Sequence, residues 1–420
     1  MTAIIDELQW RGLVAATTDE DALRQHLDGA QRSVYCGFDP TAPSLHFGNL
    51  VQLILLRHLQ RAGHRVICLV GGSTGLIGDP RPTAERVLRD KDETADNVSR
   101  IQQLVRPFLD FGGDNPAMMV NNLDWTEPIS ALDFLRDFGK HFRVNQMIRK
   151  DAVAARLASQ EGISFTEFSY QILQALDFLH LFQAEGVTVQ TGGQDQWGNL
   201  TSGVDLVHRV EGESVHVLTT PLLTDESGEK FGKSAGNAIW LSSDMTSPYA
   251  FYQYWINVAD ADVIRLLKVF TDRGRAAIEE LRLVTEQTPH RRLAQQTLAA
   301  DVTSLVHGPA ATENVRAASQ VLFGHGDPRS VDPVTLRDAT AELPKANVAE
   351  GASVVDALVA AALAPSRGAA RRLVAEGGVS LNNHKVSDVD GSLTAADFLH
   401  GQVALLKRGR KNLAALHPQG

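Results

Sequence analysis

Apolar residues in the first half of the chain fall into short continuous runs, and these runs alternate with segments of helical pattern. Runs of this length between helices are typical of parallel strands that are covered on both faces. The pattern therefore predicts an α/β fold with a doubly wound parallel sheet. The expected strands are residues 35–37, 65–70, 118–122, 187–191 and 215–223.

The other apolar residues recur mostly at helical spacing. The segments expected to be largely helical are residues 2–30, 84–109, 125–150, 168–182, 200–210 and 247–322. An insertion at about 125–165 carries many bulky apolar residues, which suit a dimer surface or a buried helical hairpin. The aromatic residues between 249 and 255 suit a domain core, which we favour, or stacking on bases. Residues 324–350 are rich in glycine, proline and polar residues and are expected to be a linker.

Composition excludes several classes of protein. The 420 residues have an ordinary balance of apolar and charged types, so the chain is neither disordered nor fibrous and is long enough for two or three domains. No apolar stretch approaches the roughly 20 residues that span a bilayer, and the N-terminus is unlike a signal peptide, so we expect a cytoplasmic protein. Two cysteines, Cys36 and Cys68, are too few for a disulfide framework and lack metal-ligand spacing.

Charge is distributed unevenly along the chain. The formal net charge is −10, but residues 366–420 hold eight lysines and arginines against four acidic residues and so carry +4. A basic tail on an acidic body suits a polyanionic partner, although a short basic surface is often only a solvated face.

Residues 35–52 read as a strand, a proline-containing turn and a helix. The turn places Thr41, His46 and the first amides of the helix at the end of a parallel strand. Unpaired N–H groups and the helix dipole attract anions at such a point. The segment therefore predicts a phosphate site, whereas a merely solvated histidine in the first turn is the simpler alternative.

Residues 168–182 predict a helix that is apolar over most of its surface. Its polar residues Tyr170, Gln174 and Asp177 fall at i, i+4 and i+7 and share one face. Because buried polar groups need hydrogen bonds, this face lines a pocket or belongs to an internal network, and we favour the pocket.

Two glycine-containing segments complete the candidate site. Gly192 and Gly193 allow a ligand to approach the backbone, and Asp195 can accept hydrogen bonds from hydroxyl groups, although an aspartate-capped turn would look similar. Residues 224–236 combine three glycines with Lys230 and Lys233. Such a loop suits closure over phosphates, or it serves only solubility.

Five segments together resemble the bacterial-type tyrosyl-tRNA synthetases, and the resemblance covers essentially the whole chain. They are YCGFDPTAPSLHFGN, GGSTGLIGDP, YQILQALDF, TGGQDQWGN and KFGKS. HFGN and KFGKS resemble the class I signatures written HIGH and KMSKS, while the other segments resemble the tyrosine pocket. The resemblance implies a Rossmann-like catalytic domain at 1–225, a helical anticodon-side domain at 226–323, the linker at 324–350, and a small α+β S4-like RNA-binding domain at 351–420.

The activity that the resemblance implies has two steps. L-Tyrosine reacts with ATP, accompanied by Mg²⁺, to give tyrosyl-adenylate and pyrophosphate, and the tyrosyl group then passes to the 3′-terminal ribose of tRNA(Tyr). A carboxylate is already nucleophilic at pH 7, so the first step needs positioning and charge neutralisation rather than a catalytic base. A homodimer is implied, with no cofactor besides ATP and Mg²⁺ and no resident metal.

The resemblance also assigns roles to individual residues. The implied catalytic residues are Thr41, His46, Arg86, Lys230, Lys233 and Ser234. Those implied for tyrosine are Tyr35, Asp79, Tyr170, Gln174, Asp177 and Gln196. Those implied for ATP are Cys36, Gly37, Asp39, Gly48, Asn49, Gly193, Asp195 and Lys233. Those implied for tRNA are Arg367, Arg371, Arg372, Lys407 and Arg408.

Three departures from the family pattern stand out. Asn49 replaces a frequent histidine, Gln52 replaces a frequent threonine near the ribose, and the loop from Asp79 to Arg86 is one residue short. The alternatives to this interpretation are another class I amino-acid-adenylating enzyme, such as a tryptophanyl enzyme, and a noncatalytic RNA-binding protein on a synthetase scaffold.

Overall fold

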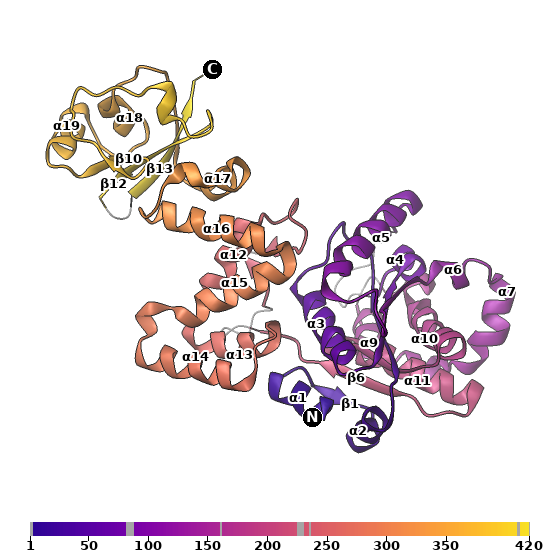
Figure 1. Ribbon diagram of the computed structural model, residues 1–420. Coiled ribbons are helices and arrows are strands. Elements are labelled where there is room, and N and C mark those ends of the chain that lie inside the picture. The colour runs from indigo at the N-terminus through magenta and orange to yellow at the C-terminus, as the bar shows by residue number, and fades with distance from the viewer. Residues whose placement is uncertain are drawn as a thin grey trace. The chain divides into compact units, whose positions relative to one another are not determined.

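The computed structural model describes residues 3–80, 88–159, 162–224, 231–234, 237–409 and 412–419. The chain divides into two compact units (Figure 1). One comprises residues 1–245 and 258–298, and the other comprises residues 246–257 and 299–420. Among the described residues, no helix is both long enough and apolar enough to cross a membrane.

A six-stranded sheet with the order β1-β6-β5-β2-β3-β4 forms the centre of the first unit. Its strands are β1 (Ala16–Thr17), β2 (Ser33–Phe38), β3 (Arg65–Val70), β4 (Met118–Asn121), β5 (Val187–Gly193) and β6 (His216–Thr220). All neighbours pair in parallel except β1, which pairs antiparallel to β6 at one edge. The predicted parallel sheet is confirmed.

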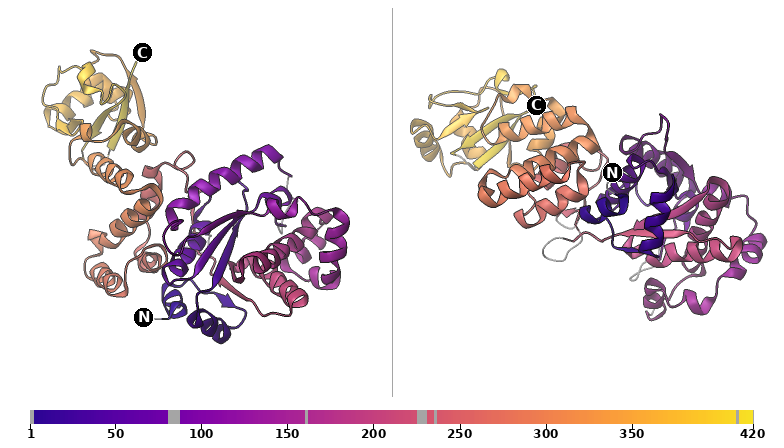
Figure 2. Two further views of the ribbon diagram at one scale, coloured as in Figure 1. Left: turned by 45° about the vertical axis from the view of Figure 1, so that its right-hand side comes forward. Right: turned by 60° about the horizontal axis from the view of Figure 1, so that its bottom comes forward.

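Helices cover both faces of this sheet (Figure 2). Tyr35 packs against Phe178 of α10 (Phe165–Glu185), with ring centroids 5.4 Å apart, whereas the next residue, Cys36, points toward Gln52 of α3 (Phe47–Arg61). Because successive side chains in a strand point to opposite faces, α10 and α3 lie on opposite sides. The other helices of eight or more residues that lie in this unit are α1 (Ile4–Arg11), α2 (Glu20–Gly29), α5 (Lys91–Val105), α11 (Trp197–Glu211), α13 (Asp260–Phe270) and α14 (Arg275–Gln287).

Two helical predictions are only partly right in this unit. Residues 2–30 contain α1 and α2, but β1 lies between them. Residues 125–150, expected as one helix, are broken into short pieces because Ser130 caps a new helix and Gly139 begins another. These pieces are α6 (Leu123–Thr126), α7 (Ala131–Asp133), the π-helical turn Phe134–Phe138, the 3-10 turn Gly139–His141 and α8 (Val144–Met147), followed by α9 (Asp151–Leu157).

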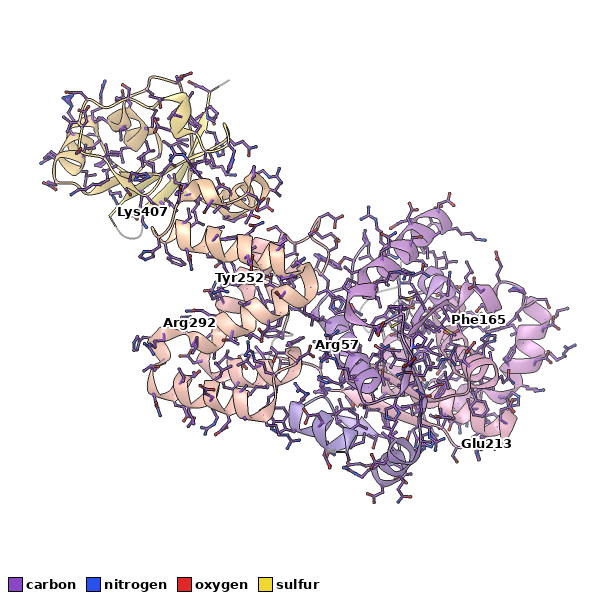
Figure 3. All side chains as sticks on the ribbon, viewed as in Figure 1. Arg57, Phe165, Glu213, Tyr252, Arg292 and Lys407 are labelled. Carbon is purple, nitrogen blue, oxygen red and sulfur yellow. The ribbon has the colours of Figure 1, made fainter. Side chains whose placement is uncertain are left out.

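The insertion exposes apolar side chains that a buried hairpin would cover. Leu132 is 79% exposed and Phe165, labelled in Figure 3, is 69% exposed. A fully buried Arg156–Glu167 ion pair, with 3.0 Å between Nη1 and Oε2, joins α9 to α10. Other apolar residues of the insertion are covered, since Met147 is 4% exposed and Phe138 and Phe142 pack against the core of this unit, so both alternatives for the insertion stay predictions.

The second unit combines helices with a C-terminal sheet. Its helices are α12 (Pro248–Ile256), the C-terminal part of α15 (Leu293–His307), α16 (Pro309–Leu322), α17 (Pro333–Thr340), α18 (Val354–Ala360) and α19 (Arg367–Ala375). In α12, Phe251 and Trp255 are fully buried. The prediction that the aromatic residues between 249 and 255 form a domain core is therefore confirmed for these two.

The C-terminal sheet has the order β11-β10-β12-β13-β9. Its strands are β9 (Lys345–Val348), β10 (Val379–Leu381), β11 (His384–Lys385), β12 (Ala404–Arg408) and β13 (Asn412–Pro418). One face packs with α18 and α19 through Ala404 and Leu406, and the other packs with α16 and α17 through Leu405 and Ala415.

The expectation of a linker at 324–350 is wrong for much of that segment. It contains α17 and β9, and β9 pairs in parallel with β13. Leu336 and Ala339 of α17 lie in the core that the sheet shares with α16. Apolar burial and strand pairing therefore hold a stretch whose composition resembles a loop.

Candidate functional site

A cavity of about 770 Å³ opens at the carboxyl ends of β2 and β5. The chain continues from β2 to β3 on one side and from β5 to β6 on the other, so the cavity lies at the topological switch point of the sheet. Its walls bring together fifteen residues singled out in the sequence: Tyr35, Cys36, Gly37, Asp39, Thr41, His46, Gly48, Asn49, Asp79, Tyr170, Gln174, Asp177, Gly193, Asp195 and Gln196.

Four residues predicted for this site cannot be placed in it. Arg86 and Lys230 lie outside the described residues. Lys233 and Ser234 form the short strand β7 (Lys233–Ser234), which pairs with β8 (Asn237–Ala238), but their side chains are also outside the described part.

His46 caps the N-terminus of α3 and is oriented by that role. Its Nδ1 accepts from the Gly48 amide at 3.0 Å, and the Asn49 side-chain oxygen accepts from the His46 amide at 3.1 Å. Because Nδ1 accepts, a neutral imidazole carries its proton on Nε2 and can donate there. The cap thus accommodates the departure at Asn49 by using its side-chain oxygen, and the side-chain NH₂ takes no part in the cap.

The deep end of the cavity holds a phenol hydroxyl and a carboxylate. The Tyr35 hydroxyl is buried without a hydrogen-bond partner. Asp177, 2% exposed, accepts from Asn122 Nδ2 at 3.0 Å and from Trp125 Nε1 at 2.9 Å. Burial raises the pKa of the Asp177 carboxyl to about 7, although these two hydrogen bonds act in the opposite direction. The deep end can therefore donate to, and accept from, a ligand hydroxyl.

Asp39 links the deep end to the middle of the cavity. Its carboxylate accepts from the Tyr170 hydroxyl at 2.7 Å and from the Thr74 hydroxyl at 2.6 Å. Thr74 in turn accepts from Asn122 at 3.1 Å. One hydrogen-bonded chain thus fixes Tyr170, Asp39 and Asn122, so the polar face of α10 is both an internal network and a cavity wall.

Asp79 is the carboxylate of a second network. It accepts from Gln196 at 3.0 Å and from Asn199 at 2.9 Å. Lys150 donates to the Gly198 carbonyl and the Ser202 hydroxyl at the start of α11. Burial lowers the pKa of Lys150 to about 8, and the nearby Asp205 and Asp79 oppose that shift. The anionic Asp79 facing the cavity suits a cationic group.

The wall beside α3 is polar but not nucleophilic. Gln52, 6% exposed, donates to the Thr220 hydroxyl at 2.6 Å, and its oxygen lies 3.7 Å from the Cys36 sulfur. Burial raises the pKa of the Cys36 thiol to about 12. Cys36 is therefore a weak hydrogen-bonding group here, since the thiolate is the reactive form.

Comparison with known proteins identifies the family. Residues 28–324 match the family described as tRNA synthetases class I (W and Y), and residues 335–416 match the C-terminal domain of SYY-like tyrosine–tRNA ligases. The tyrosine–tRNA ligase of Streptomyces coelicolor is 55% identical over 421 residues, covering 100% of both chains. The chain belongs to the tyrosine–tRNA ligase family. The ligase of Leifsonia xyli is 57% identical and covers 98% of this chain and 93% of its own.

A solved structure agrees with the family assignment. The C-terminally truncated mitochondrial tyrosyl-tRNA synthetase of Coccidioides posadasii aligns with a TM-score of 0.67 and 34% identity, covering 75% of this chain and 91% of its own. The class I synthetase fold expected for a tyrosine–tRNA ligase is therefore confirmed.

Four of the five basic residues predicted to contact tRNA have a partner within the protein, but Arg367 and Arg371 keep 73% and 56% of their side chains exposed. Lys407, labelled in Figure 3, is 8% exposed, and its ammonium lies 3.5 Å from the Leu322 carbonyl. Arg408 donates to the Leu363 carbonyl at 2.7 Å, Arg367 pairs with Asp356 at 3.0 Å, and Arg371 pairs with Asp390. Arg372 is exposed on α19.

Four residues of the two networks were missed as site residues: Thr74, Asn122, Trp125 and Asn199. Asn122 had a signal in the sequence, since two amides end the predicted strand at 118–122. Within the described ranges, no group of three or more histidine, cysteine or acidic side chains could hold a metal ion.

Proposed function

We propose that this member of the tyrosine–tRNA ligase family activates L-tyrosine with ATP, releasing pyrophosphate, and transfers the tyrosyl group to the 3′-terminal ribose of tRNA(Tyr). The observation that carries the proposal is the buried Tyr35 hydroxyl, which has no partner and lines the same cavity as Asp177. A phenol ligand would give the Tyr35 hydroxyl a partner and could also donate to Asp177, whereas phenylalanine would leave the Tyr35 hydroxyl unsatisfied. Tyrosyl-tRNA synthetases are themselves the established example of discrimination by this means.

We assign the rest of the tyrosine molecule to the Asp79 side of the cavity. Asp79, Tyr170 and Gln174 would bind the ammonium group, and Gln196 would lie near the carboxylate. The Gln174 side-chain oxygen is buried without a partner, which supports a ligand donor at that position. The ligand would thus be oriented at both ends, which is the positioning that carboxylate attack requires.

ATP would occupy the wall formed by α3 and the end of β5. Thr41 and the His46 Nε2–H would meet the phosphates at the N-terminus of α3, while Cys36, Gly37, Asp39, Gly48, Asn49, Gly193 and Asp195 would surround the nucleotide. Lys230, Lys233 and Ser234 would close over the leaving pyrophosphate, helped by Arg86, and the two lysines and the arginine would neutralise its charge. Mg²⁺ would arrive with ATP as part of the substrate.

We also propose a cytoplasmic homodimer. The exposed apolar side chains of the insertion and the start of α10 support it: Leu132, Leu135, Val144, Ile148, Leu157 and Phe165. A second copy of the chain would remove this surface from water. Sedimentation velocity of Leu132→Glu and Phe165→Glu variants should show monomers where the parent sediments as a dimer.

For the tail we propose RNA contacts by the exposed basic side chains of α19. Arg372 is the strongest candidate, whereas Lys407 and Arg408 would mainly support the fold. Arginines on such a surface contact phosphates and give salt-dependent affinity.

Exchange of labelled pyrophosphate into ATP tests the proposed chemistry. Tyrosine should support exchange, while phenylalanine and tryptophan should not. Exchange with tryptophan instead would favour a tryptophanyl enzyme, and no exchange by a folded sample that binds tRNA would favour the RNA-binding scaffold.

A further inference from the structure

Three phenylalanines from distant parts of the chain meet next to the KFGKS segment. Phe47 begins α3 directly after His46, Phe231 belongs to KFGKS, and Phe270 ends α13. The ring centroids of Phe47 and Phe231 lie 6.0 Å apart, those of Phe231 and Phe270 6.5 Å apart, and those of Phe47 and Phe270 6.3 Å apart. Such separations are those of packed aromatic pairs, and we call this set the phenylalanine triad.

The backbone beside the triad approaches one ring very closely. Gly232 has φ +91°, and a Cβ placed there would lie 2.7 Å from Cδ2 of Phe47 and 2.8 Å from its Cβ. No side chain fits in that space. The glycine of the second signature and the phenylalanine of the first are therefore sterically matched.

Main-chain hydrogen bonds connect the same segment, through residues 239–241, to Leu45 and His46 just before α3. The Phe231 amide donates to the Leu223 carbonyl at 2.9 Å, and the Ile239 amide donates to the Gly232 carbonyl at 2.9 Å. Further along, Trp240 pairs with His46 in a β-bridge, and the Leu241 amide donates to the Leu45 carbonyl at 2.8 Å. Residues 231–232 and 239–241 are thus tied to the start of α3.

We propose that the phenylalanine triad positions the backbone of residues 231–234 against the start of α3, with Phe270 as a positioning residue outside the cavity. Lys233 follows Gly232 directly, so a displacement of Gly232 would displace Lys233 as well. Misplacement by about 1 Å can cost about a hundredfold in rate. This inference rests on the proposed adenylation function.

Phe270→Leu tests the positioning role, because it keeps an apolar side chain but removes the ring. We expect the single-turnover rate of tyrosyl-adenylate formation to fall at least about tenfold, with the tyrosine Kd unchanged within about twofold. The matched control is Phe108→Leu, another phenylalanine that is 1% exposed, in the same unit but outside the triad. Equal rates for both variants and the parent would overturn the proposal.

A double-mutant cycle with Phe47→Ala and Gly232→Ala tests the steric match, because alanine at 47 removes the Cγ and Cδ2 atoms that a Cβ at Gly232 would meet. The strain of alanine at positive φ cancels in the cycle, so any coupling reports the contact. We expect Phe47→Ala to relieve part of the loss in adenylation rate caused by Gly232→Ala, and additive effects would contradict the match. Thermal unfolding of the parent, the two single variants and the double variant measures the same coupling as a difference in stability. This measurement remains possible even if the parent shows no tyrosine-dependent exchange. If the two substitutions are coupled in the free energy of unfolding but not in the adenylation rate, the triad only stabilises the core and the positioning role is wrong.

Discussion

Replacing Tyr35 by phenylalanine should separate stability from substrate recognition. The Tyr35 hydroxyl is buried and has no partner in the free protein. Deleting it therefore removes a desolvated polar group without breaking a hydrogen bond. The free energy of unfolding of Tyr35→Phe should be unchanged or higher by up to about 1 kcal/mol.

Binding of tyrosine should change in the opposite direction. A neutral hydrogen bond contributes a net of about 0.5–1.5 kcal/mol, so kcat/KM for tyrosine should fall by about two- to tenfold. Phenylalanine gains no such bond from Tyr35, so its kcat/KM should stay constant or rise. The ratio of kcat/KM for tyrosine to that for phenylalanine should therefore fall by at least the same factor.

Pyrophosphate exchange with each amino acid and urea unfolding of the free protein measure both effects. Tyr170→Phe is the matched control, because its hydroxyl does have a partner, the Asp39 carboxylate at 2.7 Å. That variant should lose about 1.5–3 kcal/mol of stability. A comparable loss in Tyr35→Phe, or an unchanged preference for tyrosine, would refute the reasoning about Tyr35.

Four further predictions address the loop, the pocket and the core. Lys233→Ala should slow adenylate formation by roughly a hundredfold or more while leaving tyrosine affinity nearly intact, as single-turnover kinetics and equilibrium dialysis would show. Burial raises the pKa of Asp177 to about 7, so the folded protein holds the Asp177 proton more tightly than the unfolded chain does. The resulting stability is fully present below about pH 4 and is lost as the pH rises through 7. In urea unfolding, the stability of Asp177→Asn relative to the parent should therefore increase from pH 5 to pH 8. Burial lowers the pKa of His58 to about 4, so its contribution to stability, present above about pH 6.5, should be lost as the pH falls toward 4, and His58→Gln should weaken that acid dependence. Arg156→Met should cost about 3–5 kcal/mol by leaving Glu167 without its buried ion-pair partner, and adding Glu167→Leu should restore most of the loss in thermal unfolding.

The sequence predicted those elements that depend on the pattern of a few neighbouring residues. The run at 65–70 matches β3 because it is continuously apolar and ends at glycines, and His46 caps α3 where the change of pattern indicates. Strand ends predicted Thr41, His46 and Asp195, and one helix face predicted Tyr170, Gln174 and Asp177, whereas only the family resemblance pointed to Tyr35, Cys36, Asp79 and Gln196.

The features that were missed depend on contacts between distant segments. The Asp177 network needs β4 beside β3 and α10 across them, since it joins Asn122 and Trp125 to a residue more than fifty positions away. The strand β9 is only four residues long, and its pairing with β13 is visible only in the folded sheet. For the same reason, composition suggested a linker where the chain forms part of a core.

The core shared by α16, α17 and the C-terminal sheet bears on how tail deletions should be interpreted. Leu405 and Ala415 of the sheet are fully buried against this core, and Asn383 donates to the Val321 carbonyl at the end of α16 at 3.0 Å. Cutting the chain near residue 350 would expose apolar helix surface as well as remove the basic helix α19. Loss of aminoacylation in such a fragment would therefore not by itself demonstrate an RNA contact, whereas point changes at exposed Arg372 leave that core intact.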